Sequence, residues 1–134
     1  MEEAGSNAIC NWRDLESWKL ARKVTQKIYG FTRHPEFNRD FGLSDQVRRS
    51  AVSIMSNIAE GFERTGNREF RNFLSIAKGS CGELESELVV ALDQQYISHD
   101  EYVEIVRMVR RTNRLIWGLM KHLAESPFLG AKFK

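Results

Sequence analysis

Residues 56–70, with the sequence SNIAEGFERTGNREF, decide how this chain folds. If the helical period of the preceding residues continues, Asn57 and Glu60 fall on a polar side and Gly61 lies at or near the helix end. A new apolar period begins at about residue 67. The stretch therefore predicts two helices joined by a short link, and not a loop that holds a ligand.

The same stretch offers no catalytic or phosphate-binding pattern. Gly61 has no GxxxxGK or GxGxxG context, and Asn57 and Glu60 have no histidine or second carboxylate close by in the sequence. Metal binding is not indicated either, because no ligand spacing relates the histidines, which are His34, His99 and His122. We expect no enzyme, no cofactor, no metal and no small-molecule substrate.

Composition indicates one soluble domain. The chain has 134 residues, and 20 Lys and Arg against 18 Asp and Glu leave a net charge of +2, which does not by itself indicate a nucleic-acid-binding protein. Cys10 and Cys81 lie far apart and predict no disulfide framework. No apolar run is long enough for a membrane span, and the acidic start does not resemble a signal peptide. We expect a cytoplasmic location.

Apolar residues recur at helical spacing in four stretches, and both prolines lie outside these stretches. The first predicted helix covers about residues 14–31, with Asp14 as its N-cap. The second begins at or near Ser44, which is its expected cap. The third covers about residues 67–93 and the fourth about residues 98–125. These helices predict an all-α fold.

The fourth helix begins with a capping box, in which Ser98 and Glu101 each bond the backbone of the other. Because the links between the last three helices are short, we expect an antiparallel up-down-up-down four-helix bundle over residues 13–126. Residues 1–12 and 127–134 are expected to be terminal tails.

Two of the predicted helices carry small or hydrogen-bonding side chains on the side away from the core. A glycine inside a helix costs about 1 kcal/mol relative to alanine, and close packing of another helix would offset this cost. We expect an interface with a second copy of the chain, although a solvated face is the alternative. The candidates are Arg49, Ser53, Ser56, Asn57 and Glu60 in the second helix, with Ser75, Gly79, Gly82 and Ser86 in the third. Arg49 is expected to pair with Glu60 of a neighbouring copy.

The outer side of the fourth helix is basic. Five cations lie within about 100° of each other around the helix axis, and they are Arg107, Arg110, Arg111, Arg114 and Lys121. This stripe is the candidate nucleic-acid site, and an oligomer would repeat it around the assembly. We expect no aromatic residue within the stripe, which argues against base stacking. The alternative is a solvated helix face that Glu104 and Glu125 partly neutralise.

Three motifs carry a resemblance that covers about residues 13–124. They are RDLESWKLA at 13–21, DQVRRSAVSIMSNIAEGFER at 45–64 and FLSIAKGSCGELESEL at 73–88. With these motifs the chain resembles the four-helix-bundle proteins encoded within 23S ribosomal RNA intervening sequences, which are distant relatives of the accessory variability determinant proteins of diversity-generating retroelements. The resemblance implies a homopentameric barrel without known enzymatic activity, and its retroelement relatives bind a reverse transcriptase and nucleic acid.

Two functional hypotheses follow. The first is a non-enzymatic oligomer that binds RNA or a nucleoprotein partner through a repeated basic surface. The second is a structural or protein-binding module whose arginines make subunit contacts. Two further residues are expected to be structural: Arg48, with its stem buried or paired, and Cys81, as a small buried hydrophobic residue.

Overall fold

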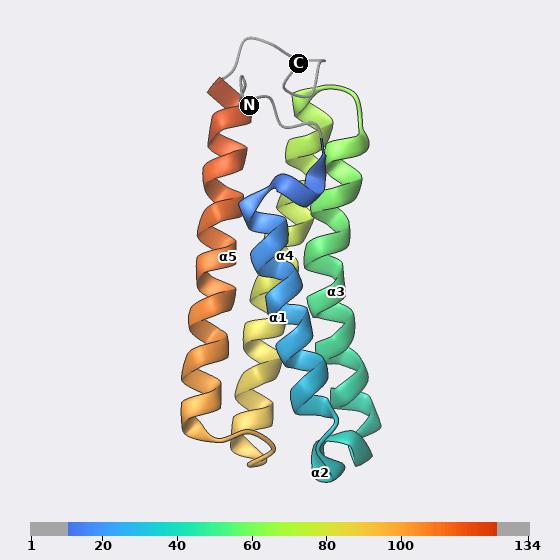
Figure 1. The fold of residues 1–134 in the computed structure, drawn as a ribbon, viewed down its shortest axis with the longest axis vertical. Coiled ribbons are helices and arrows are strands. Elements are labelled where there is room, and N and C mark those ends of the chain that lie inside the picture. Colours follow the sequence, from blue (N-terminus) through green and yellow to red (C-terminus); the bar gives the residue numbers. More distant parts are fainter. Residues whose placement is uncertain (1–10, 126–134) are drawn as a thin grey trace.

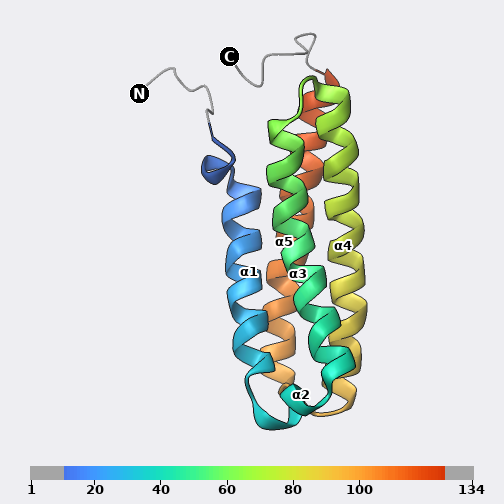
Figure 2. The ribbon, with the colours of Figure 1, turned by 90° about the vertical axis from the view of Figure 1, so that its right-hand side faces the viewer.

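Residues 11–125 are described by a computed structural model, and this part of the chain is entirely helical. Residues 1–10 and 126–134, which include most of the two predicted tails, lie outside the described part. The elements are η1 (Trp12–Asp14), α1 (Glu16–Thr32), α2 (Pro35–Arg39), α3 (Phe41–Glu63), α4 (Asn67–Asp93) and α5 (His99–Glu125). Figures 1 and 2 show the long helices α1, α3, α4 and α5 side by side, with α2 at one end.

Each long helix packs against two others. Helix α1 contacts α3 and α5, and α4 contacts the same two helices. Between α3 and α4, Ser50 bonds Glu87 and Ser53 bonds Ser80, so the partner's number falls as the residue number rises. The contacts between α1 and α3, and those between α4 and α5, also join rising residue numbers on one helix to falling residue numbers on the other. Neighbouring helices therefore run antiparallel, as the ribbon in Figure 1 also shows.

The core lies along the axis that the four long helices share. Their apolar positions repeat with the helical period, so one side of each helix is buried and the other faces solvent. The largest fully buried side chains are Phe37, Ile28, Ile54, Ile58, Leu74, Leu84, Leu88, Ile105, Ile116, Val24, Val47 and Val109. Cys81 is also buried, at 1% exposed, as expected for a small hydrophobic residue in this position.

Helix α2 closes one end of the bundle and was not expected from the sequence. Its Phe37 is 1% exposed and stacks on Tyr96 in the α4–α5 connection, with ring centroids 5.0 Å apart. The Tyr96 hydroxyl donates a hydrogen bond of 2.9 Å to Asp40, and this bond raises the pKa of Tyr96. These contacts attach the connection between α1 and α3 to the bundle.

Two predicted helix caps are wrong, and a third is confirmed. Asp14 belongs to the short η1, and α1 begins at Glu16 without a side-chain cap. Helix α3 begins at Phe41, with Asp40 accepting a bond from the Leu43 amide at 3.1 Å, while the expected cap Ser44 is buried inside the helix. Asp40 therefore supplies the cap that was expected of Ser44. The capping box at Ser98 and Glu101 is present, with bonds of 2.8 and 3.0 Å.

Gly61 lies near the end of α3, as the sequence indicated, and the helix continues to Glu63. It is buried where α3 meets α4. The link to α4 has only three residues, 64–66, and Gly66 adopts a positive φ of 87°, a conformation that glycine adopts without steric cost. No helix among residues 11–125 combines the length and apolar character needed to cross a membrane.

Candidate nucleic-acid interface

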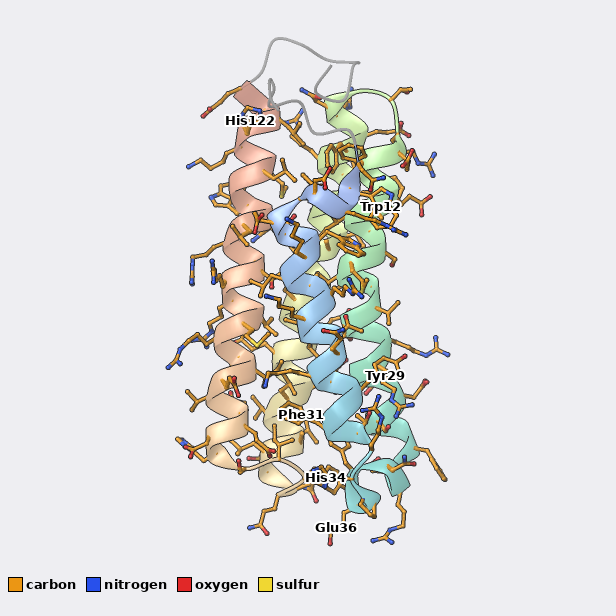
Figure 3. The ribbon with its side chains drawn as sticks, in the orientation of Figure 1. Trp12, Tyr29, Phe31, His34, Glu36 and His122 are labelled. Atoms are coloured by element: carbon orange, nitrogen blue, oxygen red, sulfur yellow. The ribbon has the colours of Figure 1, made fainter. Side chains whose placement is uncertain are left out.

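The five predicted cations of α5 are all exposed in the structure. Helix α5 buries Ile105, Val109 and Ile116 against the bundle, which turns the opposite side of the helix to solvent. Figure 3 shows nitrogen-bearing side chains projecting from this outer edge of α5. The fold therefore brings Arg107, Arg110, Arg111, Arg114 and Lys121 to one face, as the sequence indicated.

One of these cations is neutralised by a neighbouring helix. Arg110 donates to Glu85 Oε2 of α4 from Nη2 at 2.7 Å and from Nε at 3.1 Å. The hydrogen bond with Glu85 raises the pKa of Arg110. Among residues 11–125, no carboxylate forms an ion pair with the other four, which are Arg107, Arg111, Arg114 and Lys121. The stripe therefore keeps most of its charge for an external anion.

The arginines of α5 face two different hollows. Toward α4, three guanidinium groups surround a shallow hollow of about 390 Å³ with a partly apolar floor. Its lining consists of Tyr102, Val103, Val106, Arg107, Arg110 and Arg114. At the other edge of this face, toward α1, Arg111 and Leu115 line a groove of about 840 Å³ between α5 and α1.

Helix α1 and the η1 segment bring further cations to the second groove. They contribute Arg13, Lys19, Arg22 and Lys23, while Glu16 is the one acidic residue of the lining and lies 3.3 Å from Lys19. Lys19 and Lys23 are four residues apart and Arg22 is three after Lys19, so the helical period of α1 puts all three on one polar side. This spacing could have indicated a basic face on α1, but it did not indicate that α5 lies beside that face.

An aromatic side chain lies in the basic stripe, contrary to the expectation from the sequence. Trp117 is 51% exposed, three residues after Arg114 and four before Lys121. Residues at these spacings lie on the same side of a helix. The Lys78 ammonium of α4 lies 5.7 Å from the centre of the Trp117 ring. The stripe therefore combines cations with an accessible indole.

Two of the interface candidates in α3 lie where this helix meets α4. Ser53 Oγ lies 2.8 Å from Ser80 Oγ of α4. The Asn57 amide donates to the Ser53 carbonyl at 2.8 Å and to its hydroxyl at 3.0 Å. These small polar side chains fit where α3 and α4 approach closely, and they satisfy one another there.

The other candidates of α3 are exposed. Arg49 pairs with Asp45 at 2.7 Å and Glu60 pairs with Arg64 at 2.8 Å, each within one helical turn. Ser56 lies between them on the outer face of α3. Within residues 11–125, the arrangement therefore supplies Arg49 and Glu60 with partners of their own.

Helix α4 presents a face with few side-chain atoms. Ser75, Gly79, Gly82 and Ser86 are all exposed, and a Cβ added at either glycine would meet no other atom within 4 Å. Three large hydrophobic residues accompany them on the exposed side, which are Ile76 at 52%, Val89 at 42% and Val90 at 45% exposed. This outer face of α4 is smooth and partly apolar.

Titratable groups do not converge on a metal or catalytic site in the described part of the chain. No three His, Cys, Asp or Glu residues among residues 11–125 are placed to hold a metal ion. The basic groove between α1 and α5 carries a single carboxylate. Its chemistry suits the binding of an anion better than acid–base catalysis.

The comparisons with known proteins agree with this helical architecture. A crystal structure described as a protein with unknown function from the S23 ribosomal protein family of Bacteroides thetaiotaomicron superposes with a TM-score of 0.72 at 26% identity, covering 78% of this chain and 98% of that one. No curated protein sequence matches the chain. A family model described as 23S rRNA-intervening sequence protein matches residues 13–118. The chain thus belongs to the 23S rRNA-intervening sequence protein family.

Proposed function

We propose that the protein binds RNA, without catalysing a reaction, through a basic surface formed by α5 and the start of α1. The basic surface comprises Arg107, Arg111, Arg114 and Lys121 of α5 with Arg13, Arg22 and Lys23 beside the groove. The observation that carries the proposal is the concentration of unpaired cations here on a molecule whose net charge is only +2. Some cations elsewhere on the surface, such as Arg49 and Arg64, have a carboxylate partner one turn away on their own helix or its end.

Such a surface suits a phosphate backbone. Arginine presents several donors in a planar fork that matches phosphate oxygens, and each phosphate contact releases condensed counterions. Arg111 lines the groove between α1 and α5, while Arg107 and Arg114 line the hollow at the edge of the same face toward α4. The family description, 23S rRNA-intervening sequence protein, favours RNA as the anion. The retroelement proteins that the resemblance implies as distant relatives of this family bind nucleic acid, which favours the same ligand.

Salt dependence provides the test. Binding of a fluorescently labelled RNA is measured by anisotropy between about 50 and about 200 mM salt, where affinity for phosphate falls steeply. Replacing Arg107, Arg111 and Arg114 by glutamine should weaken binding and reduce the slope of log affinity against log salt by about 2, since each single-strand phosphate contact contributes about 0.7.

A matched control removes the same charge elsewhere. All three control residues are exposed: Arg33 directly follows α1, Arg39 ends α2 and Arg49 lies on α3. Their replacement by glutamine should leave the salt slope unchanged. The proposal is wrong if the wild-type chain has no affinity for RNA at low salt, if added salt does not matter, or if both triple variants behave alike.

A second candidate role is self-assembly through the outer face of α4. The observation that favours it is the exposure of Ile76, Val89 and Val90 beside the bare Gly79 and Gly82. A copy of the same chain could pack its backbone closely there, and the resemblance implies five copies. Assembly would repeat the basic surface around the oligomer.

Light scattering of the purified chain tests this assembly. Leucine at both Gly79 and Gly82 should lower the mass in solution, because the added side chains would hold the two backbones apart. Leucine at Gly118, which is exposed on α5 with open space around it, is the control and should leave the mass unchanged. A wild-type chain that stays monomeric at high concentration would exclude this role.

A further inference from the structure

Trp117 is the most unusual residue of the α5 surface. A large indole that is 51% exposed leaves apolar area in water, which a soluble protein normally buries. It is surrounded by cations, with Arg114 and Lys121 on neighbouring turns and Lys78 5.7 Å from its ring. An apolar protein partner would have to desolvate these charges, which argues against a dry protein contact.

The indole is also held in place from one side. Lys78 Nζ donates a hydrogen bond of 2.8 Å to Asn113, which stands one turn before Trp117 on α5. This bond positions the ammonium group against the ring, and a cation beside an aromatic ring is attracted to it. A ring that is already positioned loses less conformational freedom when a ligand stacks on it.

A second aromatic ring lies nearer the start of the same helix. Tyr102 lines the hollow between Arg107, Arg110 and Arg114, and it stands 15 positions before Trp117, or about 22 Å along the helix. The order along α5 is therefore an aromatic ring, four arginines, three of which line this hollow, and a second aromatic ring. Alternation of cations with aromatic rings is typical of surfaces that bind single-stranded nucleic acid.

We propose that the ligand is single-stranded RNA. One base of the strand stacks on Trp117, and phosphates of the strand contact Arg107, Arg114 and Lys121. This inference rests on the proposed function and adds the strandedness of the ligand. Every base has a π-face, so stacking requires no particular sequence. In a duplex the base faces are already stacked on each other, so Trp117 would contribute nothing to duplex binding.

The test compares two RNAs that carry equal numbers of phosphates, an unstructured single strand and a hairpin duplex. Replacing Trp117 by leucine should weaken single-strand binding at least about fivefold, the lower end for the loss of one stacked base. Duplex binding and the salt slope should not change, because no charge is removed. Replacing Trp117 by phenylalanine should restore most of the single-strand affinity.

Phe41 supplies the matched control. It is 76% exposed at the start of α3, away from the basic surface. Replacing Phe41 by leucine removes a comparable exposed ring and should leave both RNAs bound as before. Circular dichroism of each variant checks that the fold is retained.

The outcomes separate this inference from the proposed function. If the chain binds both RNAs with salt-dependent affinity but the Trp117→Leu variant loses nothing, phosphate binding stands and base stacking is excluded. The stacking inference also fails if the variant loses single-strand and duplex affinity equally, or if it changes the mass in solution instead. If the wild-type chain binds neither RNA at low salt, both proposals are wrong.

Discussion

A Cβ atom added to Gly61 of α3 would lie 2.8 Å from the Cβ of Phe73 of α4. It would also lie 2.9 Å from the Phe70 ring and 3.2 Å from the Phe70 carbonyl oxygen. Real Cβ atoms essentially never show the two shorter distances, and the third is tighter than most real contacts. Two of the three atoms belong to or adjoin the α4 backbone. The glycine in the NIAEG motif therefore permits the close approach of α3 and α4.

Gly61 and Gly79 should respond to alanine in opposite directions. Gly61→Ala should destabilise the fold by about 1–3 kcal/mol, because the added methyl group overpacks a buried contact. Gly79→Ala should stabilise a single chain by up to about 1 kcal/mol, because its site is open and alanine favours a helix. Urea unfolding measures both changes. If the Gly61→Ala variant is as stable as the wild-type chain, the close approach of α3 and α4 at Gly61 is contradicted.

Arg48 should contribute to stability and its neighbour Arg49 should not. Arg48 Nε donates a hydrogen bond of 2.8 Å to Thr32, which is fully buried, and its guanidinium lies 4.6 Å from the Tyr29 ring. Replacing Arg48 by leucine should cost about 1–2 kcal/mol, because it removes a charged hydrogen bond and a cation–π contact.

The control for this prediction is Arg49→Leu. Arg49 is 79% exposed and pairs only with Asp45 of its own helix, among the residues described. The loss of such a surface pair should change the free energy of unfolding by less than about 0.5 kcal/mol. Equal effects of the two substitutions would show that the Arg48 contacts add nothing.

Glu87 should make stability depend on pH. Burial raises its pKa above the ordinary 4.5, the Ser50 hydrogen bond opposes this rise, and the Glu83 charge adds to it. For a carboxyl whose folded pKa is raised, the ionised form costs stability, so the cost is present at neutral pH. It disappears as pH falls through the raised pKa toward 4.5.

Replacing Glu87 by glutamine should therefore raise the unfolding temperature at about pH 7 and leave it unchanged at about pH 4. The amide oxygen can still accept the bond of 2.9 Å that Ser50 donates. Glu63→Gln, an exposed carboxylate on α3, should have little effect at either pH. If Glu87→Gln raises the unfolding temperature equally at both pH values, the ionisation of buried Glu87 is not the cause of the increase.

Cys81 should react only when the bundle opens. It is 1% exposed, and burial raises its pKa to about 12, although the charge of Lys78 acts in the opposite direction. At about pH 8 only about one thiol in ten thousand would be ionised, and the thiolate is the reactive form. In a Cys10→Ser background, a thiol reagent should label the chain in denaturant and hardly at all in the native state. Rapid native labelling would show that the site opens locally.

The sequence indicated the helices because their apolar periods are long. The third predicted helix, at 67–93, has the observed bounds of α4, and the capping box at Ser98 is present. A period that repeats over several turns is insensitive to single residues, so these elements could be recognised. Helix α2 has five residues, which is too short for a period to be detected.

Helix starts were harder to predict for a physical reason. Several residues near a start can each cap the backbone, and the choice depends on which start buries more of the chain. In α3 the structure uses Asp40 and places Ser44 in the interior. Asp14 likewise lies before α1 and not at its cap, because Asn11 caps the preceding turn.

The sequence by itself determined the family, the all-helical fold and the side of each helix that is apolar. It also placed the cations of α5 on one face, since the helical period alone decides this. Only the tertiary structure decided which faces meet. It put the cations of α1 beside Arg111, paired Arg110 with Glu85, and joined Ser53 to Ser80. A helical period specifies the direction of a side chain but not its neighbour, because the neighbour depends on how distant segments pack together.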